Sequence, residues 1–235
     1  MDLSEEERKV ADSGIRTTVP HNYYFLARYQ RAANALLQRV ADALGLPPLP
    51  GVVVRYGNTQ GYAATSGAIT HPDGSGVITL NPNLPKRWEF ADTGSMMGLM
   101  AHELTHATIG AAGGFEYGEE HTIPWAFQEG MADWVKKEVV GPTLTSFPPG
   151  YVEGIIEKHP RPIHTGYQDM AGFLRWQNKR VPGSVPAIAQ QLAANTFSPQ
   201  SFQGVTGRPI HTAVHDYRFA KTQEVNAYNP VHQRI

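Results

Sequence analysis

The first regular pattern along the chain is helical and covers residues 19–45. Apolar side chains recur there every three or four residues, a spacing that gathers them on one face of an α-helix. They are Tyr24, Tyr29, Ala33, Leu36, Leu37, Val40 and Leu44. Gly45 and the pair Pro47-Pro48 come next, and such residues end helices. The pattern therefore predicts an amphipathic helix over 19–45.

Three short runs rich in β-branched and small residues then predict strands. GVVVRYG, residues 51–57, is a β-branched run bounded by glycines. The runs 61–70 and 76–81 flank the turn residues HPDGSG, so we expect these two strands to form a hairpin.

The rest of the chain predicts helices separated by glycine and proline. One helix is expected from about 94 to 111, with Asp92 or Thr93 as its cap and Gly113-Gly114 at its end. A second should run from Pro124 to about Val140, before Gly141-Pro142. The later expectations are a loop at 142–162 with one helical turn at 151–158, helices at about 165–180, 185–195 and 207–220, and an irregular, polar last fifteen residues.

The motif HELTH, residues 102–106, lies inside the helix expected at 94–111. Residues four apart share a helix face, so His102 and His106 can both offer a ring nitrogen to one metal ion. Glu103 lies about 100° further round, too far to ligate with both histidines but close enough to reach a metal-activated water. This arrangement is typical of a zinc hydrolase with Glu103 as general base. The alternative is a helix with two solvated histidines.

A catalytic zinc needs a third protein ligand. An extended HExxHxxGxxH motif would put a histidine at 112, where this chain has Ala112. Glu129 is the better candidate, in WAFQEGMADW on the second expected helix, and Asp133 follows one turn later on the same face. The aspartate can accept the free N–H of a ligating histidine. Two alternatives remain. Glu129 and Asp133 could instead form a solvated helix face, and the third ligand could instead be one of Glu116, Glu119, Glu120 and His121.

Composition excludes several classes of protein. The chain has 235 residues, of which 41% are hydrophobic and 17% charged, as in globular proteins. The net charge is −1 and no long basic run occurs, so we expect no nucleic-acid partner. No apolar stretch reaches membrane-spanning length, so we expect no membrane association. Cysteine is absent, which leaves His, Asp and Glu to hold any metal.

Four stretches together resemble the plant and microbial basic secretory protein family, zinc peptidases of the gluzincin type. HELTH is followed by WAFQEGMADW, similar to the family's glutamate-glycine-x-alanine-aspartate segment. GYQDMAGFLRW resembles its glycine-tyrosine helix, and FQGVTGRPIHTAVHDY its threonine-glycine segment. GYAATSGAI and VITLNPNL are similar to its strands before the metal helix. The resemblance covers about residues 20–220.

The resemblance implies an α+β, zincin-like fold within a single domain, 1–235. A small N-terminal mixed sheet would pack on the HExxH helix in a lobe of about 15–114. A mainly helical lobe, about 115–220, would follow, and then a polar tail, 221–235. In such folds an edge strand binds peptide by β-addition, and here that strand would be VITLN, 77–81, unless it is an internal strand.

A peptidase also needs a donor for the developing oxyanion. Tyr167, in the family-like GY segment, is our candidate, with His164, Tyr151 and Arg161 as alternatives; a tyrosine packed in the core is the other interpretation. We interpret four further aromatic residues as core rather than substrate contacts: Trp125, Trp134, Phe173 and Trp176.

We therefore expect a zinc-dependent metallopeptidase, an endopeptidase, that acts as a monomer on a peptide or protein. An aminopeptidase would need a motif for the substrate N-terminus, which we do not recognise. A catalytically silent metal-binding module with protein or glycan partners is the alternative, although it would need no general base. Secretion is implied by the resemblance alone, since the opening residues MDLSEEERKV do not form a signal peptide. The net charge of −1 and the run Gln168-Asp169-Met170 depart from the family pattern.

Overall fold

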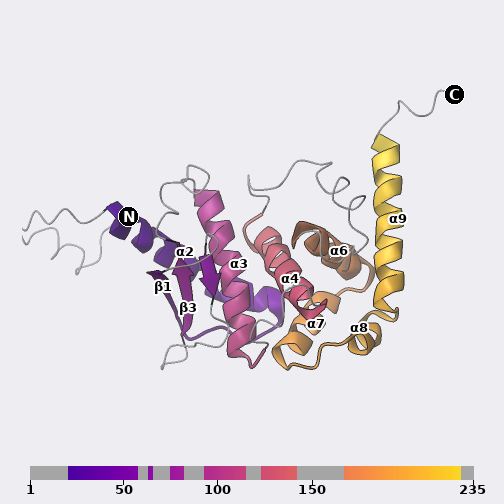
Figure 1. Ribbon diagram of the computed structural model, residues 1–235, viewed down its shortest axis with the longest axis horizontal. Helices are drawn as coiled ribbons and strands as arrows, with labels where there is room; N and C mark the ends of the chain where they lie inside the picture. The colour runs from indigo at the N-terminus through magenta and orange to yellow at the C-terminus, as the bar shows by residue number, and fades with distance from the viewer. Residues whose placement is uncertain are drawn as a thin grey trace, which may run out of the picture.

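The computed structural model describes residues 21–57, 63–65, 75–81, 93–114, 123–141 and 167–228. This part of the chain is mainly helical and has one small sheet, the α+β class that the sequence predicts (Figure 1). The strands are β1 (Val52–Tyr56), β2 (Ala63–Thr65) and β3 (Gly76–Leu80). The helices are α2 (His21–Leu44), α3 (Thr93–Ala111), α4 (Ile123–Val139), α6 (Tyr167–Arg180), α7 (Ser184–Ala193), α8 (Pro199–Thr206) and α9 (Ile210–Tyr228).

Helix α2 confirms the first expected element. Five side chains of its predicted apolar face are fully buried, Tyr29, Ala33, Leu36, Val40 and Leu44, and Leu37 is partly buried against them. Gly45 adopts φ +62, and the amide of Leu46 donates to the carbonyl of Ala41 as the helix ends. A positive φ is accessible to glycine without strain, which is why the helix stops there. The buried face packs against β1 and α3.

The sheet has the order β1-β3-β2 and is mixed. β2 runs antiparallel to β3, as expected for the hairpin, whereas β1 is parallel to β3. The strand β3 is therefore central, and the prediction that 77–81 is an edge strand is wrong. The reason lies in its burial, because Val77, Ile78 and Leu80 on both faces of β3 are buried. A nearly continuous apolar run of this kind is typical of an inner strand.

Gln30 of α2 closes the outer edge of β1. Its side-chain amide donates from Nε2 to the carbonyl of Val52 at 2.7 Å, and its Oε1 accepts from the amide of Val54 at 2.8 Å. The side chain thus makes the two hydrogen bonds that a neighbouring strand would make. An edge satisfied in this way offers no backbone groups for pairing at these two residues.

Helices α3, α4 and α6 lie side by side, with α3 against the sheet and α6 on the far side of α4 (Figure 1). The boundaries of α3 and α4 agree with the prediction, and α3 ends where Gly113 adopts φ +95 and the amide of Gly114 donates to the carbonyl of Ile109. Helix α4 packs against α3 on one side and α6 on the other. Every residue from Ala126 to Val135 is buried as a result. Such burial makes α4 the central helix of the described structure.

The C-terminal helices differ from the sequence prediction. One helix was expected at 207–220, but the structure has α8 before it and a longer α9. Helix α8 begins with a capping box between Ser198 and Ser201, with Pro199 in its first turn, and ends at Gly207 with φ +73. This start signal was missed. Helix α9 continues to Tyr228, so the irregular tail was a wrong prediction over 221–228, where good helix formers such as Ala, Lys, Gln and Glu occur.

The expected helices at 165–180 and 185–195 are confirmed as α6 and α7. The loop 142–162 and its helical turn lie outside the described residues, and the division into lobes stays a prediction. Of the four aromatic residues assigned to the core, Trp134 and Phe173 are buried, while Trp125 and Trp176 are half-buried and pack against it. No helix in the described ranges combines the length and the apolar character needed to cross a membrane.

Candidate metal centre

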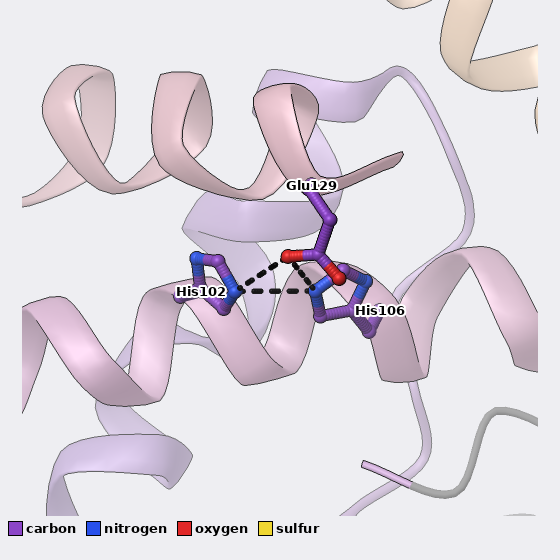
Figure 2. A group of neighbouring side chains, drawn as sticks. All are labelled: His102, His106 and Glu129. Atoms are coloured by element: carbon purple, nitrogen blue, oxygen red, sulfur yellow. Dashed lines mark hydrogen bonds and ion pairs between the residues drawn. The ribbon is translucent and has the colours of Figure 1, made fainter. Parts of the chain in front are cut away.

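The helix α3 presents two histidines on one face. The Nε2 atoms of His102 and His106 are 3.2 Å apart, one helical turn from each other (Figure 2). The opposite face of α3 is held in the core by Met100, Ala101 and Leu104, all fully buried. Because the apolar face fixes the rotation of the helix, both imidazoles turn toward α4.

Helix α4 brings a carboxylate to the same point. The Oε2 atom of Glu129 lies 3.4 Å from Nε2 of His102 and 3.5 Å from Nε2 of His106. Figure 2 shows the carboxylate pointing from its helix down between the two rings. The three donor atoms all lie within 4.8 Å of one another, and this His-His-Glu group can hold a metal ion. His106 and Glu129 are buried, whereas His102 is partly open to solvent.

Asp133 fixes the ring of His102 from behind. Its Oδ1 lies 3.0 Å from Nδ1 of His102, and the ammonium of Lys136 lies 4.0 Å from the same oxygen. Since a carboxylate only accepts, the Nδ1 of His102 carries the hydrogen of this bond. In the neutral ring the lone pair is then on Nε2, which faces His106 and Glu129. The geometry is therefore that of a ligand oriented by a carboxylate.

The electrostatics of the cluster favour a cation. Burial would lower the pKa of His102, but the hydrogen bonds that its ring donates to Asp133 and Glu129, together with the nearby negative charges, outweigh burial and raise the pKa to about 10. Burial would raise the pKa of both carboxyls. His106 and His102 nevertheless hold the pKa of Glu129 below its usual range, and His102 with the two lysines Lys136 and Lys137 does so for Asp133. Two carboxylates thus face one another across His102, and a positive charge between them is stabilised.

Glu103 is close to the cluster but is not part of the His-His-Glu group. It follows His102 directly on α3, and its side chain is only 6% exposed. Its negative charge is one of those that raise the pKa of His102. The carboxylate of Glu103 is therefore near the ligands, while the carboxylate that lies between the two imidazole rings is that of Glu129.

The other candidates lie at the border of the described structure or beyond it. Tyr167 is the first residue of α6, and its side chain is outside the described part. The alternatives for its role, His164, Tyr151 and Arg161, and the rival ligands Glu116, Glu119, Glu120 and His121, also lie outside the described residues.

Sequence reasoning missed one residue beside the site, Gly130. It lies in the buried middle of α4 directly after Glu129, where a Cβ atom would overlap the side chain of Met170 on α6. Glycine is unfavourable inside a helix, so its presence there was a signal of close packing.

Comparison with known protein families gives a match over most of the chain. The family model BSP, described as peptidase of plants and bacteria, matches residues 16–217, which include α3, α4 and the whole His-His-Glu group. No curated protein and no solved structure matches the chain.

Proposed function

The chain belongs to the BSP family of plant and bacterial peptidases, and we propose from this membership that it is a zinc-dependent metallopeptidase. The observation that carries the proposal is the convergence of His102, His106 and Glu129 on one point. Two imidazole nitrogens and one carboxylate oxygen form the ligand set of a catalytic zinc site, which leaves a fourth position open. Peptide hydrolysis is consistent both with membership of a peptidase family and with the chemistry of such a site.

Both the element types of the donor atoms and the distances between them are suitable for zinc. Tetrahedral coordination with bonds of about 2.0 to 2.1 Å places donor atoms roughly 3.3 to 3.4 Å from each other. The three donor separations here are 3.2, 3.4 and 3.5 Å. The absence of cysteine from the chain also leaves His and carboxylate ligands as the available set. These separations favour a small ion with nitrogen and oxygen ligands.

Each residue of the cluster has a distinct task in this proposal. Bound zinc supplies a Lewis acid that polarises the scissile carbonyl and makes water more acidic. Glu103 accepts the proton of the attacking water and later delivers it to the leaving amine. His102, His106 and Glu129 hold the ion, and Asp133 keeps the His102 ring in its ligating tautomer. Tyr167 donates its hydroxyl to the developing oxyanion.

The substrate is proposed to lie along the sheet as an extended peptide, as in a zincin-like endopeptidase. Strand β3 is central, and Gln30 occupies the outer edge of β1. Among the three described strands, the remaining edge is that of β2, which like β3 packs near α3. We therefore place the substrate backbone at β2.

Further expectations belong to the same proposal. The chain acts as a monomer on peptides or proteins, with no nucleic acid or membrane partner, and as a single domain. Secretion follows only from the resemblance to basic secretory proteins.

Zinc analysis joined to thermal unfolding tests the proposed site. The purified chain should hold one zinc per molecule, and removal by a chelator should lower its Tm. At a free zinc concentration of about 100 times Kd, the expected linkage is about 2.7 kcal/mol of stability. A chain that takes up no zinc, and whose Tm does not respond to it, would refute the proposal.

Replacing Asp133 by Ala should weaken zinc binding by about 10–100-fold, because the hydrogen bond that orients His102 is lost while all three ligands remain. The measurement is competition for zinc with a chromogenic chelator. Asp216→Ala is the matched control, because Asp216 pairs with Arg208, far along the chain from the cluster. Equal affinities for the two variants would remove Asp133 from the site.

Tyr167→Phe should lower kcat by roughly 10²-fold with little change in KM, because an oxyanion donor acts mainly in the transition state. A fluorogenic peptide that the wild type cleaves provides the assay, and Tyr217→Phe, on α9, is the control. An unchanged kcat would transfer the role to His164, Tyr151 or Arg161.

A further inference from the structure

Helix α6 lies against α4 at the residue that follows the carboxylate ligand. Gly130 has no side chain, and a Cβ built on it would overlap Cγ of Met170. The same Cβ would lie 2.5 Å from the Cβ of Met170 and 3.2 Å from its backbone carbonyl carbon. Contacts between Cβ atoms and other heavy atoms below 3.0 Å essentially do not occur in proteins. The two helices can therefore be this close only while residue 130 is a glycine.

A change of rotamer at Met170 would not remove the overlap. The Cβ of a residue is fixed by its backbone, so the 2.5 Å contact persists in every rotamer of Met170. Met170 is also buried, which leaves its side chain little room to move. A side chain at residue 130 would consequently push the two helices apart.

Helix α4 has no free side on which to absorb such a push. It packs against α3 as well as α6, and it is buried from Ala126 to Val135. The displacement is then shared across both contacts, including the one that places Glu129 between the histidines of α3 (Figure 2). Metal sites tolerate deviations of only about 0.2 Å in ligand distance, so a small shift of α4 matters.

We propose that Gly130 is a positioning residue of the metal centre. By allowing α6 to contact the backbone of α4, it sets the place of Glu129 relative to His102 and His106. The inference rests on the proposed zinc site, and it assigns to the glycine of the EGMAD segment a role in ligand geometry rather than in chain flexibility.

The test is a double-mutant cycle at residues 130 and 170 in which the zinc affinity of each variant is measured. Gly130→Ala should weaken zinc binding by about 10-fold or more, a loss of the size seen when a ligand is poorly oriented. In a chain that already carries Met170→Gly, the added Gly130→Ala should change the affinity by no more than about twofold, since both side-chain contacts below 3.0 Å are gone and only the 3.2 Å approach to the backbone carbonyl carbon remains. Met170→Ala removes Cγ but keeps Cβ, so with Gly130→Ala it should restore the affinity only in part.

Gly204→Ala is the matched control. Gly204 also lies inside a helix, α8, but a Cβ there would meet nothing within 4 Å. Alanine favours the helix more than glycine does, so this variant should unfold no earlier than wild type and bind zinc equally well. A general effect of Gly→Ala in a helix is thereby separated from the contact with Met170.

A second measurement needs no metal. The imidazole NMR signals of His102 and His106 in the zinc-free protein depend on the place of the Glu129 carboxylate. Gly130→Ala should shift these signals, and Gly130→Ala/Met170→Gly should return them to those of Met170→Gly alone. If wild type binds no zinc, the proposed function fails, whereas the NMR cycle still decides the inference.

Two results would overturn the inference. The first is a folded Gly130→Ala variant with wild-type histidine signals and wild-type zinc affinity. The second is a loss of zinc affinity on Gly130→Ala that is as large in the Met170→Gly background as in the wild-type background. If Gly130→Ala does not fold alone, Met170→Gly must restore its folding and its histidine signals, and failure to do so counts against the contact.

Discussion

Replacing Glu103 by Gln should leave zinc bound and lower peptide cleavage by about 10²–10⁴-fold, the contribution of a general base. The amide has the size of the carboxylate, so the buried position remains filled, but it cannot accept the proton of the attacking water. Zinc should stay because the ligand group is His102, His106 and Glu129. The variant thus separates chemistry from metal binding.

The measurements are zinc content after dialysis and kcat on a peptide that the wild type cleaves. Glu138→Gln is a suitable control, since Glu138 is an exposed glutamate of α4 that pairs with Arg175. Full activity in a zinc-loaded Glu103→Gln preparation free of contaminating peptidase would remove Glu103 from the mechanism.

Replacing Glu129 by Ala should abolish stable zinc binding. Two histidines remain, and the affinity should fall by more than the roughly 100-fold expected from losing a residue that only orients a ligand. The stability that zinc adds should disappear with it, because that stability depends on binding to the folded state. The increase in Tm on adding zinc should therefore be present in wild type and absent from this variant.

An ordered series of variants makes this prediction specific. After dialysis against a weak chelator, zinc content should be lowest for Glu129→Ala and intermediate for Asp133→Ala. Variants at Glu116, Glu119 and Glu120 should match wild type. A variant at Glu116, Glu119 or Glu120 that loses zinc while Glu129→Ala retains it would show that the third ligand has been assigned wrongly.

The elements that could be predicted are those with strong local signals. The apolar face of α2 and the glycine that ends it, Gly45, allow that helix to be predicted. Gly113-Gly114 in the same way predicts the end of α3. The family resemblance read from the ordered motifs is confirmed by the match over residues 16–217. Helix α8 was missed because the capping box at Ser198 was not recognised. The predicted end of α9 came too early because the residues that continue the helix, 221–228, are mostly polar.

The position of β3 could not be read from the hairpin pattern. A hairpin predicts the pairing of β2 with β3, but the parallel pairing with β1 joins segments without a local turn signal. The hydrogen bonds from Gln30 to the outer edge of β1 could not be predicted from the sequence either, because they depend on how α2 packs against the sheet. Both are tertiary features, and both change which edge is open to a peptide.

The site was more predictable than the sheet. Helical periodicity alone places His102 and His106 together, and one turn of helix relates Glu129 to Asp133. That α3 and α4 would bring these pairs within hydrogen-bonding distance is a result of packing. The close contact of Gly130 with Met170 also required the structure, since α4 and α6 are separated by residues 140–166 in the chain.

Cleavage of a peptide library, followed by mass spectrometry, tests the central claim most directly. The zinc-loaded chain should produce new peptide termini, which should disappear after chelation and return when one equivalent of zinc is added. The same series with Glu103→Gln should give no products above background. A chain that holds one zinc and cleaves nothing, or one whose cleavage persists without metal, would contradict the proposal that it is a zinc peptidase.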